Sequence, residues 1–244
     1  MEIHGKTALI TGSAVRIGKA ISFALAEKGC NLILHYHTSC KAVEELKIKI
    51  EQMGVTVNVI SADLSKPIET QDLIPRCLAF TNKIDILINN AGIYLGGNGM
   101  NTSLDNWERQ FELNLHAPFI LIQSFAKQIP KNECGAIVNI TDAKVFRERP
   151  DHFAYRLTKS ALIDMTKMFA LELAPNITIN SLALGIMMPL AGFEHIDVQS
   201  LAEKRIPLKK LGSPEIAAQN VIHIIEQDFM TGAVIRVDGG ESLL

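Results

Sequence analysis

Cysteine is scarce in this sequence of 244 residues, and the four that occur, Cys30, Cys40, Cys77 and Cys134, lie far apart with no CxxC pair. Such spacing argues against a disulfide framework and against a zinc site, and it fits a reducing compartment. The N-terminus lacks a basic stretch followed by an apolar one, so no signal peptide is visible. No uninterrupted apolar run approaches the roughly 18 residues that a membrane span needs. We therefore expect a cytoplasmic protein that neither enters a membrane nor binds a metal.

The chain also lacks an excess of charge of either sign. The 24 Lys and Arg residues nearly balance the 26 Asp and Glu residues, which leaves a formal net charge of -2 and no dense basic block. Binding to nucleic acid or to an anionic membrane therefore has no electrostatic footprint. Hydrophobic residues make up 48% of the chain, so it can bury a sizeable core. Linker-like and low-complexity stretches are absent, and we expect a single domain over residues 1–244.

Short apolar runs rich in β-branched residues alternate with longer helical patterns. The runs that predict strands are residues 6–11, 31–36, 55–61, 85–89, 136–141, 177–182 and 233–237. The segments that predict helices include residues 17–28, 42–53, 105–125 and 155–173. Alternating strands and helices form right-handed βαβ units, and near-continuous apolar strands suit a parallel sheet covered on both faces. The sequence thus predicts an α/β fold, a single doubly wound Rossmann domain with a seven-stranded parallel sheet flanked by helices.

A glycine-containing loop, Thr11 to Gly18, joins the first predicted strand to the first predicted helix. Gly12 permits a tight turn, and the N-terminus of the helix offers free N–H groups and the positive end of its dipole to a pyrophosphate. Two glycines before a helix also fit a plain helix-entry turn, but the preceding strand and the following helix favour a dinucleotide site. The candidate contacts in this loop are Gly12, Ser13, Arg16, Ile17 and Gly18.

The second predicted strand ends in the string YHTS at residues 36–39, without the acid that NAD-binding proteins usually place there to hold the ribose 2′-OH. A carboxylate would repel a 2′-phosphate, whereas several side chains here can donate hydrogen bonds to it. The candidate donors are Arg16, His37, Thr38 and Ser39, with Tyr36 beside them. This strand end therefore predicts NADPH as the cofactor.

Two residues with proton-transfer chemistry, Tyr155 and Lys159, are spaced four apart in a long helical segment. On a helix both side chains lie on one face, so the ammonium can favour the tyrosinate and lower the pKa of the phenol. A lone pair of this kind is usually only a surface contact. In a chain that also carries a dinucleotide loop, it is a candidate for catalysis.

These motifs resemble those of the short-chain dehydrogenase/reductase family over essentially the whole chain. The loop matches the family pattern TGxxxGxG except at Arg16, the string NNAG at 89–92 matches the signature after the fourth strand, and Tyr155 with Lys159 matches YxxxK. The resemblance implies that Lys159 also binds the nicotinamide ribose and that Asn114 supports a proton-relay water. The further cofactor contacts that it implies are Ala62, Asp63, Leu64, Asn90, Ala91, Gly92 and Gly185.

Within this family, Arg16, the string HYH at 35–37, Tyr94 and Asp142 resemble the pteridine reductases. Asp142 stands thirteen residues before Tyr155, where the family usually has serine. A serine hydroxyl can donate to a carbonyl oxygen that becomes an alkoxide, whereas a carboxylate repels that charge and can accept hydrogen bonds from an amino-substituted heterocycle. Asp142 therefore favours C=N reduction in a pterin or dihydropterin, with proton delivery through Tyr155, Asp142 and Lys159 and with dihydrofolate as a further candidate. The alternative is a buried carboxylate satisfied by backbone N–H groups.

The resemblance also bears on the substrate side of the site. Tyr94 is expected to stack the pterin against the nicotinamide, although a core or lid tyrosine would fit its position equally well. Leu184 stands where the family has proline, and the following residues 186–206 are expected to form a substrate lid. The candidate substrate contacts are Arg16, Tyr94, Asp142 and Tyr155.

Two other functions stay open. The first is a carbonyl reductase of the 3-oxoacyl type, in which Asp142 would be an individual departure with no role in substrate choice. The second is a non-enzymatic NADPH-sensing regulator on the same fold. The complete Asn, Tyr and Lys set speaks against a sensor, which does not need it. The resemblance further implies a homotetramer built through the helices at 105–125 and 155–173, whose apolar strings permit such contacts, although core burial would explain those strings equally well.

Overall fold

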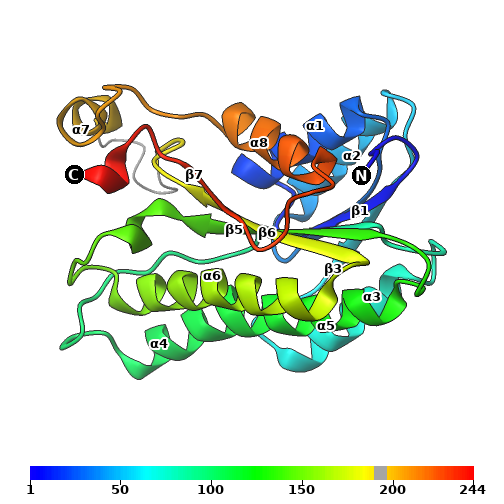
Figure 1. Cartoon of the computed structure of the whole chain (residues 1–244), viewed down its shortest axis with the longest axis horizontal. Coiled ribbons are helices and arrows are strands. Elements are labelled where there is room, and N and C mark those ends of the chain that lie inside the picture. Colours follow the sequence, from blue (N-terminus) through cyan, green and yellow to red (C-terminus); the bar gives the residue numbers. More distant parts are fainter. Residues whose placement is uncertain (190–196) are drawn as a thin grey trace.

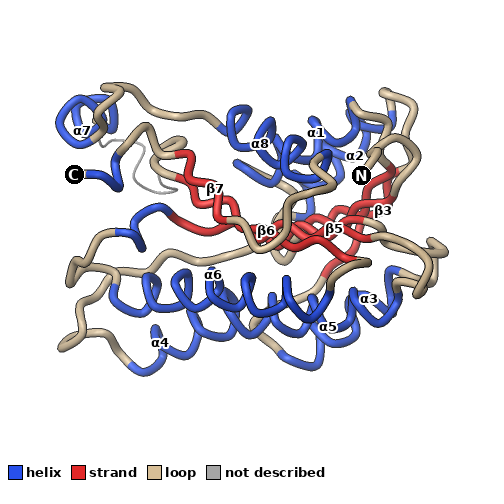
Figure 2. Tube along the Cα trace, viewed as in Figure 1, coloured by secondary structure: helices blue, strands red, loops and turns tan. Residues whose placement is uncertain are grey.

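The computed structural model describes residues 1–189 and 197–244, which form one parallel sheet between two layers of helices (Figures 1 and 2). The strands follow the order β3-β2-β1-β4-β5-β6-β7. They are β1 (Thr7–Ile10), β2 (Asn31–Tyr36), β3 (Val57–Ser61), β4 (Ile86–Asn89), β5 (Gly135–Asp142), β6 (Ile177–Leu184) and β7 (Val234–Val237). The predicted α/β class and the seven-stranded parallel sheet are confirmed.

Helices cover both faces of this sheet (Figure 1). One face carries α1 (Arg16–Glu27), α2 (Cys40–Glu51) and α8 (Pro214–Glu226). The other face carries α3 (Pro67–Cys77), α4 (Leu104–Phe111), α5 (Ala117–Gln128) and α6 (Phe153–Leu173). The short elements are η1 (Glu112–His116), η2 (Ala143–Phe146), α7 (Val198–Arg205) and η3 (Glu241–Leu243). In the described ranges, every helix is too short or too polar to cross a membrane.

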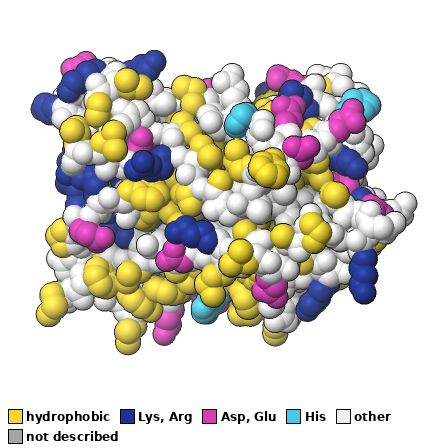
Figure 3. Space-filling view, in the orientation of Figure 1, with side chains coloured by type: hydrophobic (Ala, Val, Ile, Leu, Met, Phe, Trp, Pro, Cys, Tyr) yellow, Lys and Arg dark blue, Asp and Glu magenta, His cyan; other side chains and the backbone are white. Residues whose placement is uncertain are grey.

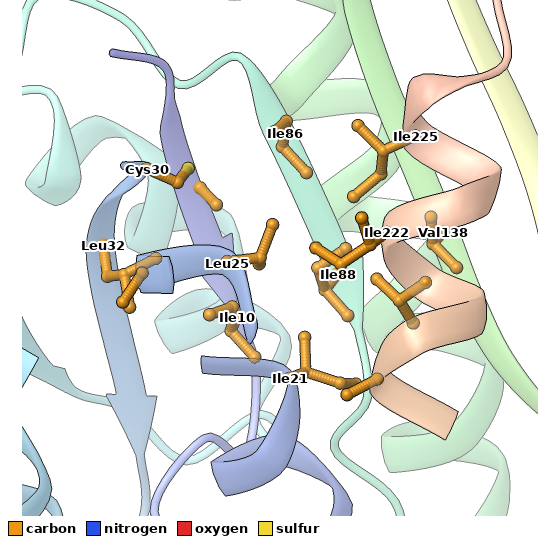
Figure 4. Close-up of a cluster of buried hydrophobic side chains, with 14 of the residues drawn as sticks. Ile10, Ile21, Leu25, Cys30, Leu32, Ile86, Ile88, Val138, Ile222 and Ile225 are labelled. Atoms are coloured by element: carbon orange, nitrogen blue, oxygen red, sulfur yellow. The ribbon is translucent and has the colours of Figure 1, made fainter. Parts of the chain in front are cut away.

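β1 to β6 each contribute to two cores, because successive side chains of a strand point to opposite faces. Ile10 packs with Ile21 and Leu25 beneath α1 and α8 (Figure 4). Its neighbour Leu9 belongs to the second core, with Phe125 of α5. This double burial explains why the strands read as near-continuous apolar runs rather than as alternating patterns.

The helix predicted over residues 105–125 forms an unbroken helical stretch, but the stretch is not α-helical throughout. It is divided into α4 and α5 by η1, a π-helical turn that contains the fully buried Asn114. The Asn114 side chain accepts a hydrogen bond from the Ile93 N–H at 2.8 Å and donates one to the Ile93 carbonyl at 2.9 Å. A π turn inserts one extra residue into a helix. Here that turn accompanies an asparagine which bonds the segment after β4 instead of facing solvent.

The sheet changes its winding direction between β1 and β4, since β1 pairs with β2 on one side and with β4 on the other. The loops that follow β1 and β4 therefore diverge at the carboxyl edge of the sheet and leave a crevice. β5 and β6 run further than predicted, to Asp142 and Leu184, which are partners in the ladder. The expected lid at 186–206 includes α7, while residues 190–196 of it lie outside the described ranges.

A buried histidine of β2, His35, holds the loop after β1. Its Nδ1 accepts a hydrogen bond from the Gly12 N–H at 3.1 Å, and its Nε2 lies 3.1 Å from the Ala62 carbonyl oxygen. The backbone donor on Nδ1 requires the neutral tautomer with its proton on Nε2. Burial lowers the pKa of His35 to about 4, although the bond to Ala62 opposes that shift.

We predict that the free energy of unfolding falls as the pH drops from about 6.5 toward 4, because the unfolded chain takes up a proton on His35 that the folded chain does not. Above this range both states are neutral at His35, and its contribution is constant. Urea unfolding should show a loss of about 2 kcal/mol between pH 7 and pH 5 from this residue. His35→Asn keeps an acceptor oxygen but cannot titrate, so its pH slope should be smaller. Equal slopes in the two proteins would contradict the prediction.

Candidate active site

A groove of about 440 Å³ lies along the carboxyl ends of the central strands. The predicted cofactor contacts that line it are Gly12, Arg16, Ile17, Gly18, Tyr36, His37, Thr38, Ser39, Asp63, Leu64, Asn90, Ala91, Gly92, Tyr155 and Lys159. Ser13 and Ala62 are buried instead, and the Ser13 hydroxyl donates to the His35 carbonyl at 3.0 Å. Gly185 lines the neighbouring pocket. Most of the predicted contacts therefore meet in one groove.

Two glycines let α1 approach the loop after β1 closely. Gly12 has a φ of +62°, a conformation that favours glycine. A Cβ atom on Gly18 would lie 2.2 Å from the Gly12 carbonyl oxygen, so no side chain fits there. Asn90 supports the loop from the other side, since its Nδ2 donates to the carbonyls of Thr11 at 2.9 Å and Gly12 at 3.0 Å. The first turn of α1, whose N–H groups lack intrahelical partners, thus lines the groove as a pyrophosphate site requires.

Arg16 begins α1 with a φ of 57°, in the left-handed region. That conformation costs a residue other than glycine roughly 1–2 kcal/mol. The guanidinium Nη2 donates to the Pro189 carbonyl at 2.7 Å, and the residue lines both the groove and the pocket beside it. A strained arginine at the junction of two pockets indicates that its side chain has a role there.

The end of β2 presents donors to the groove. The wall there carries His37, Thr38 and Ser39. The nearby carboxylate of Asp63 accepts hydrogen bonds from the Ser65 N–H at 3.0 Å and the Ser65 hydroxyl at 2.6 Å, and it lies 3.8 Å from the His37 Nε2. Asp63 is therefore engaged in its own turn, and the wall suits an anionic group.

The proton-transfer residues meet where β5 ends against α6. The Tyr155 hydroxyl donates to Asp142 Oδ2 at 2.9 Å, and the Lys144 N–H donates to Asp142 Oδ1 at 2.7 Å. The Lys159 ammonium donates to the Ile140 carbonyl at 3.0 Å. One oxygen of Asp142 is thus satisfied by a backbone N–H, as a purely structural carboxylate would be. The other oxygen accepts the hydrogen bond of Tyr155, the candidate catalytic residue.

Burial and charge set the protonation of this group. Burial, followed by the Asp142 carboxylate, raises the pKa of Tyr155 well above its ordinary value. Burial lowers the pKa of Lys159 to about 8, and Asp142 opposes that shift. The net shift of the phenol's pKa is upward despite Lys159, because burial and the Asp142 carboxylate, which accepts the hydrogen bond of the hydroxyl, both raise it. Near neutral pH, Tyr155 carries its proton.

Asn114 lies behind the site rather than on its wall. Besides its two bonds to Ile93, its Nδ2 lies 3.4 Å from the Thr158 hydroxyl of α6. A Cβ atom on Gly92 would lie 3.0 Å from the Asn114 Oδ1, so the chain passes close to this side chain. Asn114 therefore positions the segment after β4, and its role toward a water stays a prediction.

A second pocket of about 370 Å³ adjoins the groove. All four predicted substrate contacts line it: Arg16, Tyr94, Asp142 and Tyr155. Part of its wall is apolar and comes from the segment after β6, including Met187, and from Leu201 of α7. The pocket shares Tyr155 with the cofactor groove, so a ligand in each would meet at this residue.

Sequence reasoning missed two neighbours of Tyr94. The Lys144 ammonium donates to the Tyr94 hydroxyl at 2.7 Å, and the His152 ring stacks on the Tyr94 ring with centroids 4.1 Å apart. Tyr94 also meets the Tyr155 ring edge to face at 4.7 Å. Lys144 could have been found from its position two residues after Asp142, whereas His152 offered no signal. His152 covers one face of the Tyr94 ring. The predicted stacking of a substrate on Tyr94 therefore applies only to the opposite face of the ring.

A family model described as enoyl-(acyl carrier protein) reductase matches residues 12–242. The chain belongs to the short-chain dehydrogenase/reductase family. The 3-oxoacyl-[acyl-carrier-protein] reductase FabG of Aquifex aeolicus is 33% identical over 250 residues and covers 98% of each chain. FabG of Staphylococcus epidermidis is 31% identical over 239 residues, covering 96% of this chain and 98% of its own.

Solved structures place this short-chain dehydrogenase/reductase near a second group of relatives. FolM, described as alternative dihydrofolate reductase 1, from Brucella suis in complex with NADP, has a TM-score of 0.94 and 31% identity, covering 100% of this chain and 97% of its own. The FolM of Brucella canis, also complexed with NADP, has a TM-score of 0.92 and 30% identity over 100% and 97% of the two chains. The chain is therefore an oxidoreductase of this family, with relatives of two substrate classes.

The strain at Arg16 yields a prediction on stability. Arg16→Gly and Arg16→Ala both remove the guanidinium and its bond to Pro189, but only glycine adopts the left-handed backbone without strain. We expect Arg16→Gly to be more stable than Arg16→Ala by about 1 kcal/mol in urea unfolding. An alanine variant as stable as the glycine variant would show that position 16 is not strained.

Proposed function

We propose that this chain is an NADPH-dependent reductase of pterins or dihydropterins, with dihydrofolate as a further substrate, and that it reduces a C=N bond. The observation that carries the proposal is the 2.9 Å hydrogen bond from the Tyr155 hydroxyl to Asp142 on the wall of the second pocket. A carboxylate beside the proton donor suits a ring that presents N–H groups and does not suit a developing alkoxide.

NADPH is the cofactor that the groove fits. The glycine cradle at Gly12 and Gly18 leaves room only for backbone, which lets a pyrophosphate approach the first turn of α1. The donors at the end of β2, together with Arg16, suit a 2′-phosphate, and the NADP-bound FolM structures support the same choice. Bound in this groove, NADPH would supply the hydride.

The residues of the chain account for the proton. Tyr155 keeps its hydroxyl proton near neutral pH because its pKa is raised, so it can donate that proton to a ring nitrogen. Asp142 can accept N–H groups from the amino edge of the heterocycle. Lys159 is a buried cation of the same group, and its ammonium is held by the Ile140 carbonyl. One hydride added to carbon and one proton added to nitrogen complete the reduction of a C=N bond.

The second candidate function is reduction of a 3-oxoacyl thioester. It is supported by the curated relatives named FabG, at 31% and 33% identity. It requires a hydrogen-bond donor for the carbonyl oxygen, and Asp142, when ionised, cannot be that donor. The FolM structures, with similar identity to this chain, support the pterin class instead.

Steady-state assays with dihydrobiopterin, dihydrofolate and acetoacetyl-coenzyme A test these proposals. With NADPH we expect turnover of the two dihydropterins and little of the thioester. With NADH in place of NADPH, kcat/KM should fall, since the donors at the end of β2 and Arg16 lose the 2′-phosphate. Turnover of the thioester alone would favour the second candidate, and equal efficiency with both cofactors would contradict the choice of NADPH.

Asp142 provides the sharper prediction. Asp142→Ser replaces the acceptor with a donor suited to an alkoxide, and we expect it to lower dihydropterin kcat/KM by at least about tenfold while raising thioester reduction. Asp142→Asn is the matched control, because it keeps the size of the side chain and removes the charge. Undiminished dihydropterin reduction in both variants would mean that the carboxylate serves only to cap η2, through its bond to the Lys144 N–H.

We also propose that the protein is a cytoplasmic homotetramer. The apolar strings of α5 and α6 divide between core and surface: Leu121 and Phe169 are buried, whereas Phe119 and Met168 are exposed, Met168 by 71%. Hydrophobic side chains gather along the lower edge of the molecule, over α4, α5 and α6 (Figure 3). A second copy could cover this face. All four cysteines are free, which suits the reducing cytoplasm.

Light scattering tests the assembly. Met168→Glu places a charge on the exposed face of α6, and we expect the scattering mass to fall below that of the wild type because burying that charge is costly. Ile48→Glu makes the same change at a 58% exposed site on α2 and serves as the control. A wild type that is monomeric at micromolar concentration would refute the tetramer, and equal masses for all three proteins would refute this interface.

A further inference from the structure

A side cavity of about 130 Å³ adjoins the substrate pocket. The two spaces share Tyr94, Lys144 and Arg205 as wall residues. Tyr94 is the partition between them: its ring meets Tyr155 edge to face at 4.7 Å, and it stacks on His152 of the side cavity at 4.1 Å. Only the Tyr94 ring therefore separates the side cavity from Tyr155, the candidate proton donor.

The wall of this cavity is strongly basic. Of the eleven described residues on this wall, five are Lys or Arg and two are carboxylates, although the whole chain carries a formal net charge of -2. A concave wall of one charge sign focuses the electrostatic potential and attracts ligands of the opposite charge. The charge of this wall thus suits an anion.

Arg156 gives the cavity a fixed frame. Its Nη2 pairs with the Asp151 carboxylate at 3.1 Å, its Nε donates to the Asp151 carbonyl at 2.9 Å, and its Nη1 donates to the Arg147 carbonyl at 2.8 Å and to the Lys144 carbonyl. These bonds hold the backbone of the segment that carries Arg147 and Arg149. The charge of Arg156 is therefore used within the protein.

Three other arginines are free to bind a ligand. Within residues 1–189 and 197–244, the side chains of Arg147, Arg149 and Arg205 make no hydrogen bond or ion pair. Arginine presents a planar fork of donors that matches carboxylates and phosphates. The opposing charge on the wall is Glu241, whose Oε2 is buried without a hydrogen-bond partner among the described residues. Burial raises the pKa of Glu241, and Lys144 opposes that shift.

We propose that the side cavity binds an anionic group on the side chain of the substrate, a carboxylate or a phosphate, while the ring to be reduced lies in the substrate pocket. This proposal rests on the proposed pterin reductase function and names the class of pterin, one with an acidic tail. Arg147 and Arg149 line the side cavity and not the substrate pocket, so they contact the tail alone. Glu241 weakens the attraction for that tail.

The test compares three substrates under NADPH: dihydrofolate, a dihydropterin with a phosphate ester on its side chain, and neutral dihydrobiopterin. In a double variant, Arg147→Gln with Arg149→Gln, we expect kcat/KM for an anionic substrate, divided by that for dihydrobiopterin, to fall about tenfold, mainly through KM. Glu241→Gln should raise the same ratio. Arg109→Gln, at an exposed site on α4 outside both pockets, is the control and should leave it unchanged.

The outcomes distinguish a carboxylate from a phosphate as the bound group, and they test anion binding in the side cavity separately from pterin reduction. A ratio that falls only for dihydrofolate assigns the cavity to carboxylates, and one that falls only for the phosphate ester assigns it to phosphate. KM for the bound class should also rise with added salt, as expected for exposed charges. Unchanged ratios for both anionic substrates, or equal losses for all three substrates, would overturn this inference while leaving pterin reduction intact. A wild type that reduces no dihydropterin would overturn both.

Discussion

The close approach of α1 to the loop after β1 is the constraint on which the cofactor end of the molecule depends. The contact leaves 2.2 Å for any Cβ atom at Gly18, so the helix start lies against the loop itself. His35 and Asn90 hold the loop on its two sides, one from β2 and one from the segment after β4. The positive end of the α1 dipole is thereby fixed at the groove. The strained backbone at Arg16 belongs to the same turn and places a cation where the two pockets join.

At the other end of the groove, the chemistry depends on how the half-buried Asp142 and the buried Tyr155 and Lys159 share their charges. Asp142 accepts the proton of Tyr155 in a hydrogen bond, which keeps the phenol neutral, and it favours the charged form of Lys159 against burial. A proton donor that is bonded to Asp142 and a cation that Asp142 stabilises therefore coexist in one site. This arrangement differs from one in which an ammonium ionises the tyrosine, and it suits a substrate that needs a proton on nitrogen.

Much of the fold could be predicted because its signals are local. Apolar runs, the glycine loop and the Tyr155–Lys159 spacing depend on neighbours in the sequence, and the strand at 31–36 has the bounds that its pattern indicates. The π turn inside the helical stretch at 105–125 could not be predicted, because it accompanies a tertiary bond between Asn114 and Ile93, 21 residues earlier in the chain. The net pKa shift of Tyr155 depends on burial and on the distance to Asp142, which the sequence does not contain.

The π turn at η1 has a geometric consequence for the whole lower layer of helices. Each residue of an α-helix advances by about 100° around the axis, so a single extra residue rotates everything beyond it by that amount relative to everything before it. α4 therefore presents its packing face to α6, whereas α5 presents its own to α3 and the sheet (Figure 1). Two helices that are continuous in the chain act as separate structural units with a phase shift between them. Asn114 lies in the π turn between α4 and α5, where its side chain can point into the protein without being part of the packing face of either helix.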